Sequence, residues 1–209
     1  EILTSEKLQL REILRIVIAV VETLGELHKI PIIHKDIKPS NIIVNYETGQ
    51  VKLTDFGIAT RLEVSKQAIA NPNLLEGTLA YIAPEQTGRM NRSIDYRCDY
   101  YALGATFYEM LTGRVPFIST EPMELVHCHI AKMPVPPDRL ETNIESKNSL
   151  IPKAVSNIVM KLLAKNAEDR YQSAAGLKHD LESCLNQLLT NGKIEEFPLG
   201  QEDKGSQLL

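Results

Sequence analysis

The sequence has little cysteine and lacks the closely spaced cysteine pairs that are typical of zinc sites. The 209 residues include three cysteines, Cys98, Cys128 and Cys184, and none of them stands in a CxxC motif. An odd number of isolated cysteines supports neither a disulfide framework nor a four-thiolate zinc site. We therefore expect free thiols and a reducing compartment, the cytoplasm.

The sequence also lacks a large excess of one charge and a long apolar run. Lys and Arg total 23 against 27 Asp and Glu, and a net charge of −4 offers no electrostatic footprint for nucleic acid or an anionic membrane. The most apolar stretch, 16–21, lies between Arg15 and Glu22, whereas a membrane span needs about 18 apolar residues. With 43% hydrophobic and 24% charged residues, the composition is that of a globular domain. We expect no nucleic-acid partner and no membrane segment.

The spacing of apolar residues predicts five helices and one β-hairpin. From residue 5 to 30, apolar side chains recur every three or four positions, and no proline occurs before Pro31. Two short β-branched runs, 41–45 and 51–54, flank a turn that contains Gly49, which is typical of a hairpin. Four more helical patterns cover residues 98–111, 123–131, 152–163 and 174–189. The expected fold class is therefore mainly α with a small β-hairpin.

Two segments show no periodicity. Residues 58–80 form a loop of unusual length for a compact domain, and such loops are usually functional. Residues 191–209 have few large apolar side chains and include Gly200 and Gly205, so we interpret them as a linker. The predicted organisation is one lobe over residues 1–190, followed by that linker.

Polar residues with complementary chemistry gather after the first helix. The run HKDIKPSN at 34–41 is irregular, because its proline cannot continue a helix. Asp36 and Lys38 alternate on an extended backbone and point to one side, where the carboxylate can accept a hydroxyl proton and the ammonium can neutralise a phosphate. Asn41 and Asp55, the latter at the end of the second hairpin strand, supply oxygen ligands suited to Mg²⁺.

These residues belong to a larger pattern that resembles the eukaryotic-type Ser/Thr protein kinases. Five motifs stand in the family's order and spacing: HKDIKPSN at 34–41, DFG at 55–57, APE at 83–85, DYYALG at 99–104 and EDRY at 168–171. The resemblance covers roughly residues 5–190. It implies a protein-kinase-like C-terminal lobe, that is, the α+β family fold with its N-terminal lobe missing.

The resemblance implies a role for each matching residue. Asp36 is similar to the catalytic base that orients the acceptor hydroxyl, and Lys38 to the contact of the γ-phosphate. The implied cofactors are ATP and Mg²⁺. The residues implied to bind the nucleotide are Lys38, Ser40, Asn41, Ile43 and Asp55, of which Asn41 and Asp55 hold the metal. The residues implied to have structural or regulatory roles are His34, Phe56, Gly57, Thr78, Glu85, Asp99 and Arg170.

Two of these implied roles concern contacts. His34 and Phe56 match the family's stacked pair, which is anchored by Asp99. Glu85 and Arg170 match its buried ion pair.

The sequence departs from the family's pattern in three respects. Lys35 replaces an arginine and lacks the forked guanidinium that grips a phosphorylated activation loop. Between 58 and 77 only Thr60 and Ser65 carry hydroxyls, which leaves little support for phospho-dependent activation. No GxG motif occurs and no VAIK-like strand precedes the first helix, so the glycine-rich loop and its lysine are absent from the sequence. We therefore expect a C-terminal lobe that is inactive alone.

Three segments, 77–92, 157–172 and 197–201, are similar to large bacterial multi-domain signalling kinases. In those proteins a Ser/Thr kinase domain leads into an AAA-type NTPase module and then into sensor and histidine-kinase modules. The partners implied for this chain are ATP, a protein substrate with Ser or Thr, the missing N-terminal lobe, and downstream NTPase and sensor modules.

Three functions compete at this point. A protein Ser/Thr kinase in signal transduction is favoured, because Lys38 and Gly77-Thr78 resemble the Ser/Thr form of the family. The alternative is a non-catalytic, pseudokinase-like interaction module, although such a module has no need of intact Asp36, Lys38, Asn41 and Asp55. A stand-alone NTPase fails, because the sequence has no GxxxxGK[ST] motif.

Simpler interpretations exist for single residues. Asp36 alone would be read as a loop cap and Asp55 as a turn residue. His127 and His129, on either side of Cys128, suggest a metal site, but alternate positions of a helix point to different faces. We expect His127, Cys128 and His129 to be ordinary helix residues.

Overall fold

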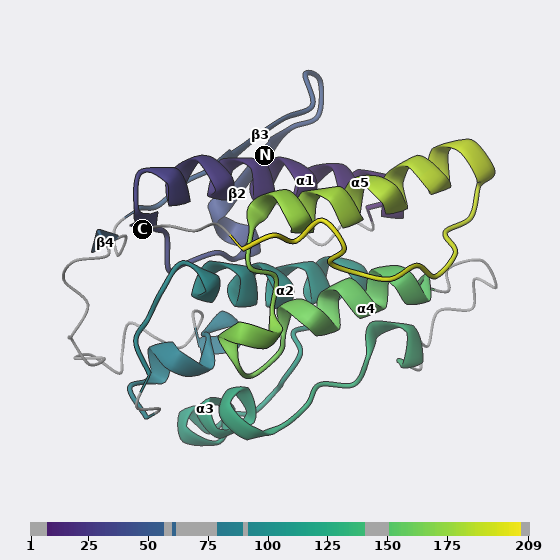
Figure 1. Cartoon of the computed structure of the whole chain (residues 1–209). Helices are drawn as coiled ribbons and strands as arrows, with labels where there is room; N and C mark the ends of the chain where they lie inside the picture. Colours follow the sequence, from purple (N-terminus) through teal and green to yellow (C-terminus); the bar gives the residue numbers. More distant parts are fainter. Residues whose placement is uncertain (1–7, 57–59, 62–78, 90–91, 141–150, 206–209) are drawn as a thin grey trace.

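The structure is a computed structural model that describes residues 8–56, 60–61, 79–89, 92–140 and 151–205. These residues form five α-helices and two short antiparallel strand pairs (Figure 1). The helices are α1 (Leu10–Lys29), α2 (Arg97–Thr112), α3 (Pro122–Ala131), α4 (Lys153–Leu162) and α5 (Ala174–Asn191). The prediction of a mainly helical domain with a small hairpin is confirmed.

Helix α2 is the centre of the lobe. Its residues from Cys98 to Tyr108 are all buried, whereas α1 buries one face of apolar side chains. α1 packs against α2 and α5, and α2 packs against α4. The last contact depends on Gly104, because a Cβ atom there would lie 2.7 Å from the Cβ of Leu162. A larger residue at this position would push the two helices apart.

The strands place the polar loop between two short β pairings. β2 (Ile42–Asn45) and β3 (Gln50–Leu53) form the predicted hairpin, in which Ile42 lies opposite Leu53. β1 (Ile32–Ile33) pairs with β4 (Thr60–Arg61), a pairing that the sequence did not predict because two residues show no alternation. The loop that carries Asp36 thus leaves β1 and enters β2.

Several element boundaries differ from the prediction. α1 begins at Leu10 rather than residue 5, and residues 1–7 lie outside the described part. Asn41 ends a short 3₁₀ helix, Pro39–Asn41, instead of starting a strand. Proline at the first position of this turn fits, because its missing N–H has no partner to lose there. Among the described helices, none has the length and apolar character needed to cross a membrane.

The segment interpreted as a linker packs on the lobe over its described part. After α5 the chain turns back and runs along α4 and α5 (Figure 1). Ile194, Phe197 and Leu199 contact the main core there. Whether a further module follows this segment stays a prediction.

Candidate active site

A buried carboxylate on α2 anchors the loop after β1. Asp99 Oδ2 accepts a hydrogen bond from the backbone N–H of His34 at 3.0 Å, and Oδ1 accepts one from the N–H of Lys35 at 2.8 Å. Nε2 of His28, in the last turn of α1, lies 3.0 Å from Oδ2. A buried carboxylate is costly unless it is hydrogen-bonded, so these contacts hold the loop in one conformation. That conformation includes a left-handed backbone at Lys35, where φ is 68°.

The anchored loop brings three of the predicted site residues together. Asp36 is only 8% exposed, and Nζ of Lys38 lies 2.8 Å from its Oδ2. The side-chain amide of Asn41 donates to the same Oδ2 at 2.9 Å and to the backbone oxygen of Asp36 at 2.8 Å. The loop therefore assembles a carboxylate, a cation and an amide around one point.

Asp55 follows directly on a residue that is bonded to this loop. The N–H of Thr54 donates to the backbone oxygen of Asn41 at 2.9 Å, and the backbone oxygen of Thr54 lies 3.2 Å from Nε2 of His34. Asp55 itself is exposed and has a left-handed φ of 61°. The end of β3 is thereby fixed beside the loop that contains Asp36.

The oxygen atoms of Asn41 and Asp55 fit a magnesium ion that is shared with phosphates. The Asn41 amide nitrogen is bonded to Asp36, so its Oδ1 is the atom left to act as ligand. Amide and carboxylate oxygens suit Mg²⁺, which keeps waters or phosphate oxygens in its remaining positions. In the part of the chain that the structure describes, no cluster of three or more His, Cys, Asp or Glu could hold a metal. Asn41 and Asp55 together offer an amide oxygen and a carboxylate, a donor set that suits Mg²⁺ when other ligands complete its coordination.

The remaining predicted residues fall into three groups. The rings of His34 and Phe56 lie 4.7 Å apart between centroids, and Phe56 is 45% exposed. Ser40 is exposed in the 3₁₀ turn, and Ile43, on β2, is 38% exposed. Gly57 and Thr78 lie outside the described residues.

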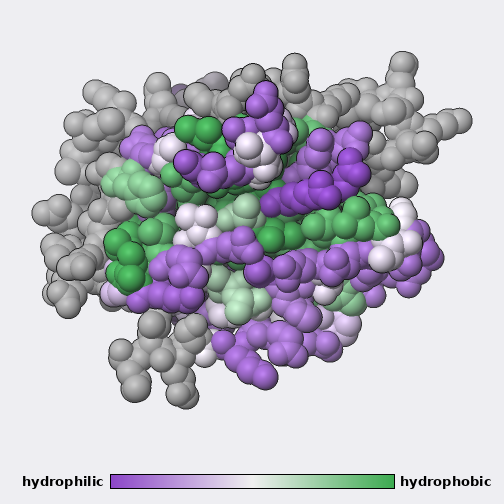
Figure 2. All heavy atoms as spheres, turned by 90° about the horizontal axis from the view of Figure 1, so that it is seen from above, coloured by the Kyte–Doolittle hydropathy of each residue, from purple (hydrophilic) through white to green (hydrophobic). Residues whose placement is uncertain are grey.

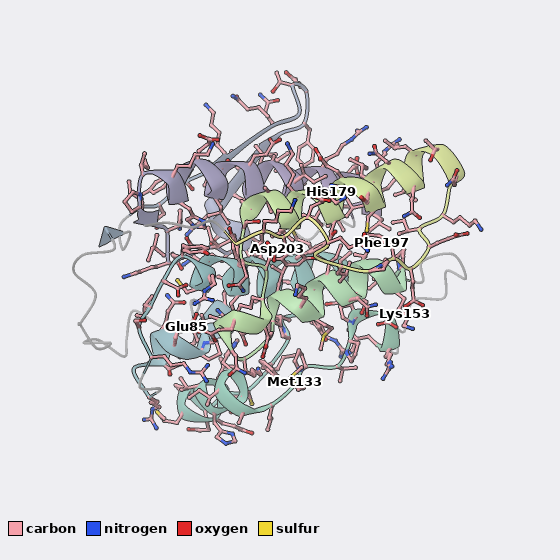
Figure 3. The ribbon with its side chains drawn as sticks, in the orientation of Figure 1. Glu85, Met133, Lys153, His179, Phe197 and Asp203 are labelled. Atoms are coloured by element: carbon pink, nitrogen blue, oxygen red, sulfur yellow. The ribbon has the colours of Figure 1, made fainter. Side chains whose placement is uncertain are left out.

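An ion pair deep in the lobe fixes the short 3₁₀ helix Pro84–Thr87. Arg170, 1% exposed, donates from both terminal nitrogens to the carboxylate of Glu85, at 2.6 and 2.8 Å. The side chain of Gln86 in turn donates to the backbone oxygen of Lys35 at 3.4 Å. The 3₁₀ helix Pro84–Thr87, whose Glu85 is labelled in Figure 3, is thus bonded both to the helical core and to the polar loop.

Comparison with known proteins gives the family. Residues 1–181 match the family described as the protein kinase domain. The chain belongs to the protein kinase family. Three similar relatives are a probable serine/threonine-protein kinase of Clostridium perfringens, 40% identical over 165 residues; one of Corynebacterium efficiens, 38% over 167; and serine/threonine-protein kinase PknB of Mycolicibacterium smegmatis, 35% over 171.

These relatives are much longer than the region that matches. The alignment covers 79% of this chain but 22% of the Clostridium relative, and 80% of this chain but 24% of the Corynebacterium relative. For the Mycolicibacterium relative the two shares are 82% and 26%. The chain therefore spans about a quarter of the length of the curated relatives it matches. The resemblance to Ser/Thr protein kinases that the motifs indicated is confirmed at the level of the family.

Two residues that contact the loop or its anchor, His28 and Thr106, belong to none of the five motifs. His28 contacts Asp99, and the hydroxyl of Thr106 lies 3.2 Å from the backbone oxygen of Ile37. His28 follows Leu24 by four positions and so falls on the buried face of α1, which was a usable signal. Nothing in the sequence singled out Thr106.

The side chains of His127 and His129 do not converge on one point. His127 is exposed, whereas His129 is fully buried with its Nδ1 2.9 Å from the hydroxyl of Tyr101. Burial, with a smaller contribution from the charge of Lys165, lowers the pKa of His129 to about 3. The two histidines lie on different faces of α3, as their alternate positions predict.

His129 makes the stability of the lobe depend on pH. Its pKa rises to an ordinary 6.5 in the unfolded chain, so between pH 3 and 6.5 the unfolded state binds more protons and stability falls as the pH falls. From pH 7 to 5 we expect this site to remove about 2 kcal/mol from the free energy of unfolding. Urea melts at pH 7, 6 and 5 should show a shallower pH dependence for His129→Asn. An equal dependence in both proteins contradicts this assignment.

Proposed function

We propose that this protein transfers the γ-phosphate of Mg·ATP to Ser or Thr hydroxyls of protein substrates. The observation that carries the proposal is the contact of Asp36 with both Lys38 and Asn41, at 2.8 and 2.9 Å. A carboxylate for the acceptor hydroxyl, a cation for the phosphate and an amide ligand for the metal stand within one loop. The relatives named serine/threonine-protein kinases support the same reaction.

Each residue has a physical task in this reaction. Asp36 accepts a hydrogen bond from the acceptor hydroxyl, orients its oxygen toward phosphorus and takes its proton. Lys38, held beside Asp36, neutralises charge on the transferred phosphoryl group. Asn41 and Asp55 would hold Mg²⁺, which would supply positive charge to stabilise the transferred phosphoryl group. Ser40 and Ile43 contact the nucleotide, and the ring contact of His34 with Phe56 supports the segment that carries Asp55.

We infer that the chain is the C-terminal lobe of the kinase and needs an N-terminal lobe to act. The hairpin exposes Ile43 and Tyr46, and on the face seen from above apolar side chains form a band between hydrophilic ones (Figure 2). Exposed apolar surface of this kind favours a covering partner. The glycine-rich loop and the lysine that align ATP would come from that lobe.

The wider context belongs to the same proposal. The similarity of residues 77–92, 157–172 and 197–201 to bacterial multi-domain kinases supports an NTPase module and sensor modules after residue 209. A cytoplasmic location, where ATP is available, is part of the proposal. A pseudokinase-like interaction module is the weaker alternative, because it requires no contact between Asp36 and Lys38.

The test measures transfer of labelled γ-phosphate by the natural full-length protein to three acceptor peptides that differ only in Ser, Thr or Tyr. We expect Mg²⁺-dependent labelling of the Ser and Thr peptides and little labelling of the Tyr peptide. A peptide with Ala at the acceptor position is the matched control. Nucleotide binding without transfer to any peptide would favour the non-catalytic module.

A further inference from the structure

The chain beyond α5 forms an ordered strap across the lobe. The family match ends at residue 181, yet residues 192–205, here called the C-terminal strap, run back along α4 and α5 toward the start of α5 (Figure 1). Glu196 lies 3.1 Å from Nζ of Lys153 on α4. Phe197 and Leu199 contact the main core. The strap is thus seated by an ion pair and by apolar packing along its length.

The end of the strap is fixed at the first turn of α5. Asp203, labelled in Figure 3, lies beside the start of α5. It accepts a hydrogen bond from the N–H of Gln172 at 2.8 Å and another from the hydroxyl of Ser173, also at 2.8 Å. That same hydroxyl accepts from the N–H of Gly176 at 3.0 Å and caps the helix. A negative charge is favourable at a helix N-terminus, where backbone N–H groups are unpaired.

Two further contacts show that this seat is specific. A Cβ atom on Gly176 would lie 2.5 Å from Cα and Cβ of Asp203, so only glycine allows the strap to come this close. The N–H of Gly200 donates to Oδ2 of Asp180 at 2.7 Å, and the hydroxyl of Tyr171 donates to the same oxygen at 2.6 Å. The strap therefore satisfies polar groups that α5 would otherwise leave to water.

Gln172 connects the seat of the strap to the buried ion pair. Its backbone oxygen accepts from the Tyr96 hydroxyl at 2.8 Å, and its side-chain oxygen accepts from Arg97 at 2.8 Å. Its side-chain nitrogen donates to the backbone oxygen of Arg170 at 2.8 Å. Arg170 also donates to the backbone oxygen of Arg97 at 3.0 Å, besides its bonds to Glu85.

We propose that Asp203 is a positioning residue: by seating the strap on Gln172, it holds Arg170 and so the 3₁₀ helix Pro84–Thr87, which contains Glu85. This inference rests on the proposed function: Gln86, in the same 3₁₀ helix as Glu85, donates to the backbone oxygen of Lys35, next to the residue proposed to bind the acceptor. When the strap leaves its seat, the N–H of Gln172 loses its partner and the Glu85–Arg170 pair loses support on one side. A downstream module that pulls on the strap thereby weakens binding of the protein substrate, whereas the site of Asp36 and Asn41 keeps its own bonds.

The experiment compares Asp203→Asn with Glu202→Gln in the natural full-length protein. The control removes the same charge one residue away, at an exposed side chain that pairs only with Lys204 among the described residues. We expect faster amide hydrogen exchange over residues 84–88 and 172–176 in Asp203→Asn alone. We also expect its KM for the protein substrate to rise about three- to tenfold, while kcat and the KM for ATP stay within twofold.

Other results overturn the inference. If residues 84–88 exchange at the wild-type rate in Asp203→Asn, the strap does not support the 3₁₀ helix that contains Glu85. This holds even if residues 172–176 exchange faster. An equal change in Glu202→Gln assigns the effect to charge alone. If Asp203→Asn fails to fold, the same measurements on Phe197→Ala decide, since that change loosens the strap along its length. If the wild-type protein transfers no phosphate, the proposed function is wrong. The hydrogen-exchange rates then still show whether the strap supports the helix that contains Glu85.

Discussion

Asp36→Asn in the natural full-length protein should lower the rate of phosphoryl transfer by about 10²- to 10⁴-fold, the usual contribution of a positioned general base. The amide cannot take the proton of the acceptor hydroxyl, and it loses the charge that faces Nζ of Lys38 at 2.8 Å. Nucleotide affinity should stay within about threefold, because the change affects the acceptor side of the site. Single-turnover phosphorylation and titration with a fluorescent nucleotide measure the two effects separately.

Two matched variants make this prediction specific. Asp169→Asn makes the same chemical change at an exposed side chain that bonds to Asn166, and it should leave both quantities unchanged. Asp55→Asn should weaken Mg·ATP binding as well as transfer, since Asp55 is assigned to the metal. A fully active Asp36→Asn protein would contradict the assignment of Asp36 as the catalytic base.

Arg170→Ala should destabilise the lobe by about 3–5 kcal/mol, the cost of stranding one charge of a buried pair. The carboxylate of Glu85, 5% exposed, would lose its two bonds from Arg170 at 2.6 and 2.8 Å. The backbone oxygens of Ala164 and Arg97 would lose their bonds from the same guanidinium. Urea unfolding of residues 1–209, followed by circular dichroism, measures the loss.

A double-mutant cycle separates the pair from its surroundings. Adding Glu85→Gln to Arg170→Ala should recover part of the loss, because no buried charge then remains unpaired. Lys29→Ala removes the exposed pair with Glu26, which is equally close at 2.7 Å, and should change stability by less than about 0.5 kcal/mol. Additive effects of the two changes would show that Glu85 and Arg170 do not interact in solution.

The sequence predicted best what depends on neighbouring residues. The hairpin follows from β-branched runs around Gly49, whose φ is 71°. The contact of Asp36 with Lys38 follows from their alternation on an extended backbone. The Glu85–Arg170 pair, by contrast, joins positions 85 apart, and only the resemblance to a family could suggest it.

Features that depend on contacts between distant parts of the folded domain could not be predicted from the sequence. β1 and β4 have two residues each, too few to show a pattern. The sequence predicted a linker at the strap, because its apolar residues are few and show no periodicity, and Phe197 and Leu199 become partly buried only by contact with the core of the folded domain. The carboxylate of Asp99 serves His34 and Lys35 through backbone groups, which no side-chain pattern reveals.

We propose that residues 34–55 carry the catalytic groups of one lobe of a kinase, which acts only together with a second lobe. The decisive measurement runs the labelled-phosphate assay on residues 1–209 beside the natural full-length protein, at equal concentration. Positioning supplies most of the catalysis in phosphoryl transfer, so we expect the shorter chain to label a Ser or Thr peptide at least about 10³-fold more slowly. Comparable rates in the two proteins would contradict it.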